Sequence, residues 1–408
     1  MNVLGIIAEY NPFHNGHLYH LQTSKELANA DYCVCIISGN FSQRGTPCLV
    51  NKWSKAQMAL CSGIDLVLEL PSIYSISSAE NFANGSIKIL NNLQIVTHLS
   101  FGSELGDLSL LDEFANILYH EPKEYVTLLS HELSKGISYA KARENALLMY
   151  LNDIRKYANI LSNPNNILAI EYLKALKQQK SSIIPITIQR TSVGHHSIIP
   201  SGNIASSTNI RELFKQQKNI KNYIPYETYE ILQNAMKYGK VVGDLSVFEK
   251  EILYTFRKMS TEEIANLPDV SEGLENAVKK AADSSVSLDE FITKMKSKRY
   301  TFTRLQRIML YAILDITKKD MADSKVIKQP YIRVLGMNQK GKELISLIKY
   351  ANPKLPIITS VKEFTNVNKN KILANMLNTD ILSTNLYTLG YEYDSSSNLD
   401  YTQKIIVI

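Results

Sequence analysis

Long apolar runs are absent from this chain of 408 residues, which contains four cysteines and one tryptophan. No apolar run approaches the roughly 18 residues that a membrane-spanning helix requires. The first residues also lack a basic segment ahead of an apolar stretch, which is the pattern of a signal peptide. We therefore expect a soluble protein with neither a membrane span nor a secretion signal.

The few cysteines also argue against a disulfide framework or a zinc site. Cys33, Cys35, Cys48 and Cys61 all lie in the first part of the chain. Cys33 and Cys35 would share one face of a strand, and this spacing is more typical of small buried side chains than of metal ligands. We predict no metal site and expect a cytoplasmic, reducing location.

Neither sign of charge dominates the composition. The chain has 45 Lys and Arg against 39 Asp and Glu, giving a net charge of +6 and a pI near 8.8. This mild excess permits a polyanionic partner without demanding one. The hydrophobic content of 45% is ordinary for a globular protein, and the length favours two domains over one core.

The first half of the chain alternates strand-like and helix-like segments. Apolar runs at 3–8, 32–37, 64–68, 95–99 and 182–188 predict strands, several of them buried on both faces. Helical periodicity covers 16–28, 53–61, 79–93, 108–118 and 139–151. This alternation predicts right-handed β–α–β crossovers and an α/β fold, namely a Rossmann-like, doubly wound parallel sheet.

The second half is mainly helical. Helices are expected near 226–237, 246–257, 274–282, 288–295 and 303–317, and a mixture of short strands and helices follows from residue 331. We therefore predict a nucleotide-binding domain at 1–220 and a mainly helical domain at 221–408 that has a small mixed α/β end.

The richest motif lies at 11–17, directly after the first predicted strand, and contains His14 and His17. Ligands of open α/β sheets bind outside the carboxyl ends of the strands, and a helix N-terminus there suits phosphate. Both histidines share one face of the opening helical turn, Gly16 permits close backbone approach, and Pro12 stiffens the turn. The motif predicts a polyphosphate site; an ordinary loop with two exposed histidines is the alternative.

The residues His14, Asn15, Gly16 and His17 form the H-x-G-H signature of the nucleotidyltransferase α/β-phosphodiesterase superfamily. A longer ordered set of runs resembles the bacterial tRNA(Met) cytidine acetate ligase family; these runs lie at 9–17, 38–45, 101–104, 164–168, 298–301 and 331–337. The resemblance extends to about residue 340 and so covers most of the chain.

This resemblance implies a reaction. Acetate and ATP would give acetyl-adenylate and pyrophosphate, with Mg²⁺ on the polyphosphate, and the acetyl group would pass to the wobble cytidine of elongator tRNA(Met), giving N(4)-acetylcytidine. Two alternatives remain open. One is a small-molecule adenylyltransferase of the pantetheine-phosphate or nicotinamide-mononucleotide type. The other is a non-catalytic RNA-binding protein.

The resemblance also implies a set of ATP-binding residues, with His14 and His17 as the catalytic pair. The set comprises Ile7, Ala8, Glu9, Tyr10, Asn11, Pro12, Phe13, His14, Asn15, Gly16, His17, Gly102, Asn165, Asn166, Arg190, Ser207, Thr208 and Arg211. The segment 204–211 resembles the I-S-S-T-x-I-R motif that holds a triphosphate, although its hydroxyls would equally serve as a simple helix cap. Gly102 and the two asparagines have similar alternatives, as a turn glycine and a helix cap.

A basic run near residue 300 is the predicted tRNA contact. Lys298, Arg299, Arg304 and Arg307 are interleaved with aromatic residues, and the run contains no acidic residue. Positive charge binds phosphate, and aromatic rings stack on unpaired bases. A solvated helix face is the alternative for this run. Arg44 and Lys52, at the ligand edge of the sheet, are open to phosphate binding, RNA binding or simple solvation.

Overall fold

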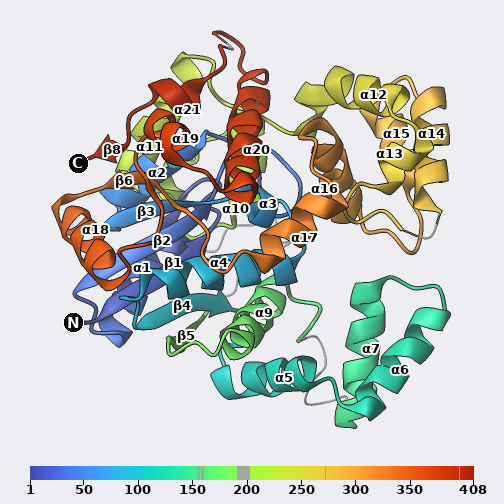
Figure 1. Cartoon of the computed structure of the whole chain (residues 1–408), viewed down its shortest axis with the longest axis horizontal. Helices are drawn as coiled ribbons and strands as arrows, with labels where there is room; N and C mark the ends of the chain where they lie inside the picture. Colours follow the sequence, from blue (N-terminus) through green and yellow to red (C-terminus); the bar gives the residue numbers. More distant parts are fainter. Residues whose placement is uncertain (154–156, 158–159, 191–202, 272, 395) are drawn as a thin grey trace.

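The computed structural model describes the chain except residues 154–156, 158–159, 191–202, 272 and 395. Its centre is an eight-stranded sheet in the order β5–β4–β1–β2–β3–β6–β7, with β8 beside β6 (Figure 1). The strands are β1 (Val3–Ala8), β2 (Tyr32–Ser38), β3 (Leu66–Leu70), β4 (His98–Ser103), β5 (Ile184–Gln189), β6 (Ile332–Met337), β7 (Ile357–Ile358) and β8 (Ile406–Val407).

The first five strands are mutually parallel, which confirms the predicted doubly wound sheet. Every residue of β3 is buried, as expected for a parallel strand covered on both faces. Strand β4 begins three residues later than predicted, since Thr97 instead bonds the backbone of Val3 through both its amide and its hydroxyl.

Two hydrophobic cores lie on opposite faces of the sheet. On β1, Val3 and Ile7 belong to one core and Leu4 and Ile6 to the other, which is the alternation of a strand covered on both sides. The first core receives the helices α4 (Ala79–Leu93), α5 (Leu108–His120) and α9 (Pro164–Gln178). The second receives α1 (Asn15–Leu27), α2 (Lys52–Cys61), α10 (Ser207–Lys215) and α11 (Tyr226–Lys237).

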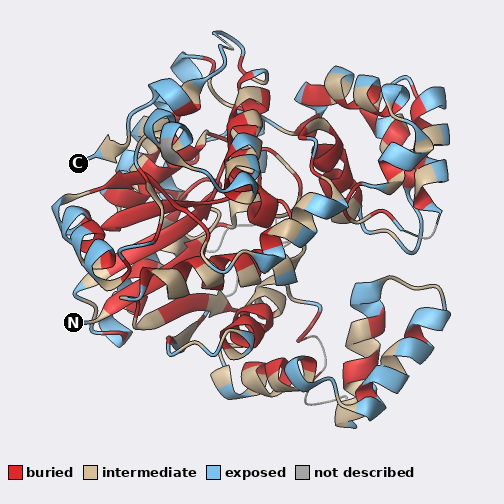
Figure 2. Cartoon of the chain, in the orientation of Figure 1, coloured by how far each residue is buried: buried red, intermediate tan, exposed pale blue. Residues whose placement is uncertain are grey.

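Two helical units project from the same side of this sheet-containing body, to the right in Figure 1. The smaller is a hairpin of α6 (Lys123–Ser134) and α7 (Tyr139–Leu151). The larger comprises α12 (Glu249–Lys258), α13 (Thr261–Ala265), α14 (Leu274–Ser284), α15 (Leu288–Met295) and α16 (Phe302–Ile313). Figure 2 shows exposed outer faces on both units, whereas the sheet is buried throughout its centre. The predicted helices of this larger unit are confirmed, with ends that agree to within four residues; both ends of α15 coincide with the prediction.

The last part of the chain returns to the sheet. Strand β6 pairs antiparallel with β3, and β7 and β8 then pair with β6. The remaining helices are α3 (Ser72–Ser75), α17 (Lys318–Val326), α18 (Gln339–Ala351), α19 (Val361–Val367), α20 (Lys371–Thr388) and α21 (Leu399–Thr402). The small mixed α/β end, predicted to belong to the second domain, is thus continuous with the sheet of the first. The functional division at residue 220 stays a prediction.

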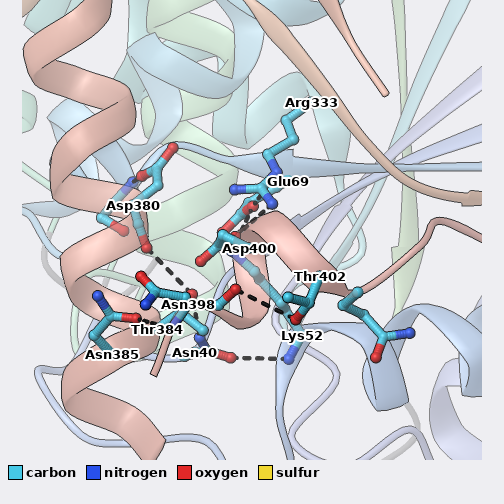
Figure 3. Close-up of polar contacts among 12 residues, drawn as sticks. Asn40, Lys52, Glu69, Arg333, Asp380, Thr384, Asn385, Asn398, Asp400 and Thr402 are labelled. Atoms are coloured by element: carbon cyan, nitrogen blue, oxygen red, sulfur yellow. Dashed lines mark hydrogen bonds and ion pairs between the residues drawn. The ribbon is translucent and has the colours of Figure 1, made fainter. Parts of the chain in front are cut away.

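A buried ionic network joins this returning segment to the first half (Figure 3). The ammonium group of Lys52 lies 2.9 Å from the Glu69 Oε1 atom and 2.7 Å from the Asp400 Oδ1 atom. Arg333 on β6 pairs with the same two carboxylates. Because buried charges are stable only when they are paired, these long-range partners fix β6 and α21 against the sheet.

Candidate active site

A cavity of about 1380 Å³ opens at the carboxyl ends of β1, β4 and β5. Glu9, Gly102 and Arg190, which lie at or just beyond the carboxyl ends of these strands, all line it. Parallel strands place their carboxyl ends at one edge, so segments far apart in the sequence meet here. Helix α10 starts at the same cavity, and residues of α7, α9 and α16 form its far walls.

His14 and His17 are locked together at the start of α1. The His17 backbone N–H donates to His14 Nδ1, and the His14 backbone N–H donates to His17 Nδ1, each over 3.3 Å. The two side chains thereby form a capping box in which histidine replaces the usual hydroxyl and carboxylate. Their rings stack with centroids 3.6 Å apart and an interplanar angle of 21°.

This capping geometry fixes the tautomer of both imidazoles. Each Nδ1 accepts a hydrogen bond, so the proton of the neutral ring lies on Nε2. His14 Nε2 is buried and has no hydrogen-bond partner among the described residues. A buried donor without a partner is costly, and this one belongs to a residue that lines the cavity. The pair can therefore present Nε2–H donors to a ligand oxygen.

Burial keeps these rings neutral. It lowers the pKa of His14 to about 3, and the guanidinium groups of Arg190 and Arg211 add to the effect. Burial, together with the adjacent His14 ring, lowers the pKa of His17 well below its usual value. At neutral pH both imidazoles are thus hydrogen-bond donors without charge, and the positive charge at this end of the cavity comes from arginine.

Gly16 is required by the position of His14. A Cβ atom at residue 16 would lie 2.9 Å from His14 Cε1 and 3.1 Å from Nδ1. The ring is held by its own hydrogen bond and cannot move away without breaking the cap. The glycine of the motif therefore preserves the orientation of the histidine.

Residues 204–211, the segment predicted to bind the triphosphate, contain the first turn of α10, which lies at the cavity wall. Ser206 is the helix cap, because its hydroxyl accepts from the Asn209 backbone N–H over 3.1 Å. Ser207, Thr208 and Arg211 line the cavity. The Arg211 Nη1 atom donates to the Asn11 carbonyl over 2.8 Å, which holds its guanidinium beside the β1–α1 turn. Ser206 lines the cavity as well, so the helix cap and the other hydroxyls of this segment face the same space.

Of the other predicted ATP ligands, some line the cavity and some do not. Gly102 and Arg190 lie together, since a Cβ at residue 102 would be 3.2 Å from Arg190 Cγ. Asn165 also lines the cavity and donates to Glu104 Oε1 over 2.6 Å. Asn166 does not line it; its side chain accepts from the Leu105 N–H and donates to the Ile160 carbonyl.

Three further residues of the motif do not line the cavity but support the β1–α1 turn; they are Pro12, Phe13 and Asn15. Phe13 is fully buried, and its ring centroid lies 5.6 Å from that of His17. Asn15 donates to the carbonyls of Asn203 and Asn222, each over 2.9 Å. The remaining residues predicted before His17 face the cavity; they are Ile7, Ala8, Glu9, Tyr10, Asn11, His14 and Gly16.

The basic segment near residue 300 lies at the cavity wall opposite the histidine pair. Part of its positive charge is neutralised by an acidic residue from outside the segment. Arg307 pairs with the Asp269 carboxylate at 2.9 Å, and Arg304 donates to the Asp269 carbonyl over 2.8 Å. Arg299, Arg304 and Arg307 line the cavity, whereas Lys298 is exposed outside it. The acidic partner missing from the run itself comes from a residue more than 30 positions earlier.

Arg44 and Lys52 lie in different surroundings. Arg44 lines the cavity. Lys52 is completely buried in the ionic network and reaches neither solvent nor the cavity, so phosphate binding, RNA binding and solvation are all wrong for it. The prediction failed because the sequence around Lys52, the first residue of α2, gives no sign of partners that come from residues 69 and 400.

The sequence analysis did not predict five acidic or basic residues that line the cavity, namely Glu80, Glu104, Arg143, Glu171 and Asp269. Glu80 lies on α4, Arg143 on α7 and Glu171 on α9. Glu104 is the last residue of the run at 101–104 that resembles the ligase family, so the sequence did contain a signal for it. Arg143 and Glu171 sit in unremarkable helices and meet only in the folded chain.

Comparison with known proteins agrees with this geometry. The family model described as HIGH nucleotidyl transferase matches residues 1–402. The tRNA(Met) cytidine acetate ligase of Thermoanaerobacter sp. strain X514 is 46% identical, and that of Acetivibrio thermocellus is 41% identical, each over the whole of both chains. The apo crystal structure of Thermotoga maritima TmcAL superposes with a TM-score of 0.95 at 32% identity, again over both whole chains. The form bound with alpha-thio ATP gives a TM-score of 0.92.

Proposed function

The chain belongs to the tRNA(Met) cytidine acetate ligase family within the HIGH nucleotidyl transferases, and we propose that it acetylates the wobble cytidine of elongator tRNA(Met). In the first step, acetate displaces pyrophosphate from ATP and forms acetyl-adenylate. In the second, the exocyclic amine of the cytidine attacks the acetyl carbon, AMP leaves, and the amine loses a proton. The products are N(4)-acetylcytidine, AMP and pyrophosphate.

The observation that carries this proposal is the locked histidine pair. Its Nε2–H groups are neutral, directed donors at the mouth of the β1–α1 turn, and His14 Nε2 has no partner among the described residues. Displacement at the α-phosphorus develops negative charge on the bridging oxygen and on pyrophosphate. Preorganised donors in a closed site stabilise such charge without reorganising during the reaction.

The other residues of the cavity would bind different parts of ATP. Ser207, Thr208 and Arg211 would bind the phosphates beside the start of α10, where the helix dipole also favours an anion. Gly102, Asn165 and Arg190 would hold the nucleoside near the ends of β4 and β5. No side chain needs to act as a nucleophile, so catalysis rests on positioning and electrostatics.

Mg²⁺ fits this site as an ion held by the phosphate oxygens of ATP, where it would neutralise phosphate charge. The described residues contain no group of three or more His, Cys, Asp or Glu side chains that could bind a metal.

We expect the enzyme to act in the cytoplasm, where its tRNA substrate is found. In the described part of the chain, no helix is both long enough and apolar enough to cross a bilayer.

The helical region beyond residue 220 would receive the tRNA. Lys298 and Arg299 are both exposed; Arg299 lines the cavity, whereas Lys298 lies outside it. Exposed cations there would bind the phosphates of the anticodon arm while the wobble base enters the cavity.

Labelled acetate and ATP, incubated with and without tRNA, test this proposal. We expect pyrophosphate exchange that depends on acetate but not on tRNA, and N(4)-acetylcytidine by nucleoside mass spectrometry once tRNA is added. Adenylyl transfer to a phosphorylated small molecule, with no requirement for acetate, would instead support a small-molecule adenylyltransferase. Failure to bind ATP in calorimetry would support a non-catalytic RNA-binding protein.

A further inference from the structure

The cavity has a second region on the side of α4, α7 and α9. Glu80, Tyr139, Arg143 and Glu171 line this region. A typical small-molecule pocket has a volume of about 300–1,000 Å³. The whole cavity measures about 1380 Å³, so it leaves room for a second ligand group beside a nucleotide.

Glu171 stands apart from the other carboxylates of the cavity. Its side chain is 2% exposed, and its Oε1 atom accepts from Arg143 Nη1 over 2.5 Å. Its Oε2 atom is buried and receives no hydrogen bond from the described residues; the ammonium of Lys174 lies 3.7 Å away. The other carboxylates of the cavity each accept hydrogen bonds, namely Glu9, Glu80, Glu104 and Asp269.

The chemistry of this pair indicates what it can bind. A carboxylate repels phosphate, so this region does not suit the triphosphate. A carboxylate acceptor beside a guanidinium donor matches a ligand edge that carries an amine next to a ring acceptor. Cytosine has that edge, with N4–H₂ as donor and N3 as acceptor, whereas uracil presents O4 as an acceptor.

We propose that Arg143 and Glu171 recognise the cytosine that receives the acetyl group. Glu171 Oε2 accepts a hydrogen bond from the N4 amine, and Arg143 donates to a ring acceptor, N3 or O2. The inference rests on the proposed function and assigns the base subsite within it. Because α7 belongs to the projecting hairpin and α9 to the sheet-containing body, the subsite spans two parts of the molecule.

The variant Glu171→Gln tests this assignment with little change of shape. Glutamine keeps a carbonyl oxygen for Arg143 and places an NH₂ donor where Oε2 was, which would suit uracil O4. We expect the affinity ratio for tRNA with cytidine over tRNA with uridine at the target position to fall about 10-fold or more. Acetate-dependent pyrophosphate exchange is measured on the same variant, so that a defect in forming acetyl-adenylate is separated from a change in base discrimination.

Glu80→Gln is the matched control. Glu80 lines the same region, but its carboxylate is already bonded to Lys174 over 2.7 Å. It should leave the cytidine-to-uridine ratio unchanged. If Glu171→Gln does not fold, Arg143→Lys keeps the ion pair and removes the planar donor edge, and it should lower the same ratio.

Several results would overturn the assignment. An unchanged ratio in a folded Glu171→Gln protein, or equal loss for both tRNAs, would mean that the pair only supports the fold. Adenine presents the same donor–acceptor edge as cytosine, so a raised KM for ATP in the exchange reaction would place the nucleotide base there instead. Absence of exchange in the wild-type protein would be a failure of the proposed function and not of the subsite.

Discussion

The two ends of the cavity are built in different ways. At the proposed nucleotide end, the histidine pair is positioned by backbone groups three residues away, and the buried His14 Nε2 atom has no partner among the described residues. At the arginine end, Arg304 and Arg307 are held by Asp269, 35 and 38 residues away, and their guanidinium groups are already paired. Local hydrogen bonds thus position the end that we propose binds ATP, whereas long-range hydrogen bonds and ion pairs shape the end that we propose receives the tRNA.

The largest expected effect is at the nucleotide end. We expect His17→Ala to lower acetate-dependent pyrophosphate exchange by about 10²- to 10³-fold, because it removes a proposed transition-state donor, the ring stacked on His14 and the acceptor of the His14 backbone N–H. Binding of tRNA, measured by filter retention, should stay within about two-fold of wild type. His131→Ala, an exposed histidine on α6, is the control. Near-normal exchange by the His17 variant would contradict the assigned role.

A smaller effect is expected from Gly16→Ala. The added methyl carbon would lie 2.9 Å from His14 Cε1, so the ring must tilt and its Nε2 atom must move. Misplacement of this size lowers catalytic rates by about 10- to 100-fold. Pyrophosphate exchange and thermal unfolding should be measured together. Loss of exchange with an unchanged melting temperature is expected, whereas wild-type exchange would show that the cap tolerates the shift.

The same difference between local and long-range contacts determines which features could be predicted from the sequence. The parallel sheet and the β1–α1 turn were predictable because apolar runs and short motifs determine them through neighbouring residues. The Lys52 network was not, because Glu69, Arg333 and Asp400 are brought together only by the antiparallel return of β6. Nothing in its own segment predicts that β6 joins β3, or that Asn166 turns its side chain away from the cavity.

At the arginine end, replacing an exposed cation should act on tRNA binding, whereas replacing a buried one should act on stability. Arg299→Ala removes an exposed cation, so tRNA affinity should fall a few-fold and the slope of log K against log salt should decrease by about one. Arg307→Ala offers a contrast, because that side chain is buried against Asp269 and its loss should mainly lower stability. An unchanged salt slope for Arg299→Ala would remove it from the interface.

A further prediction concerns the pH dependence of the free energy of unfolding. The pKa of His14 is lowered from 6.5 to about 3 in the folded protein, so between these values only the unfolded chain binds this proton. The free energy of unfolding should therefore fall as the pH is lowered from 6.5, by up to about 1.4 kcal/mol per pH unit from this residue. Urea unfolding of the wild type and of His14→Asn should show the shallower dependence in the variant. Parallel curves below pH 6 would mean that His14 titrates normally.

The most direct test of the central claim is a structure of this protein with a non-hydrolysable ATP analogue. The account predicts phosphate oxygens within hydrogen-bonding distance of the Nε2 atoms of His14 and His17, with Arg211 on the same phosphates. A triphosphate bound elsewhere, with the β1–α1 turn vacant, would contradict it.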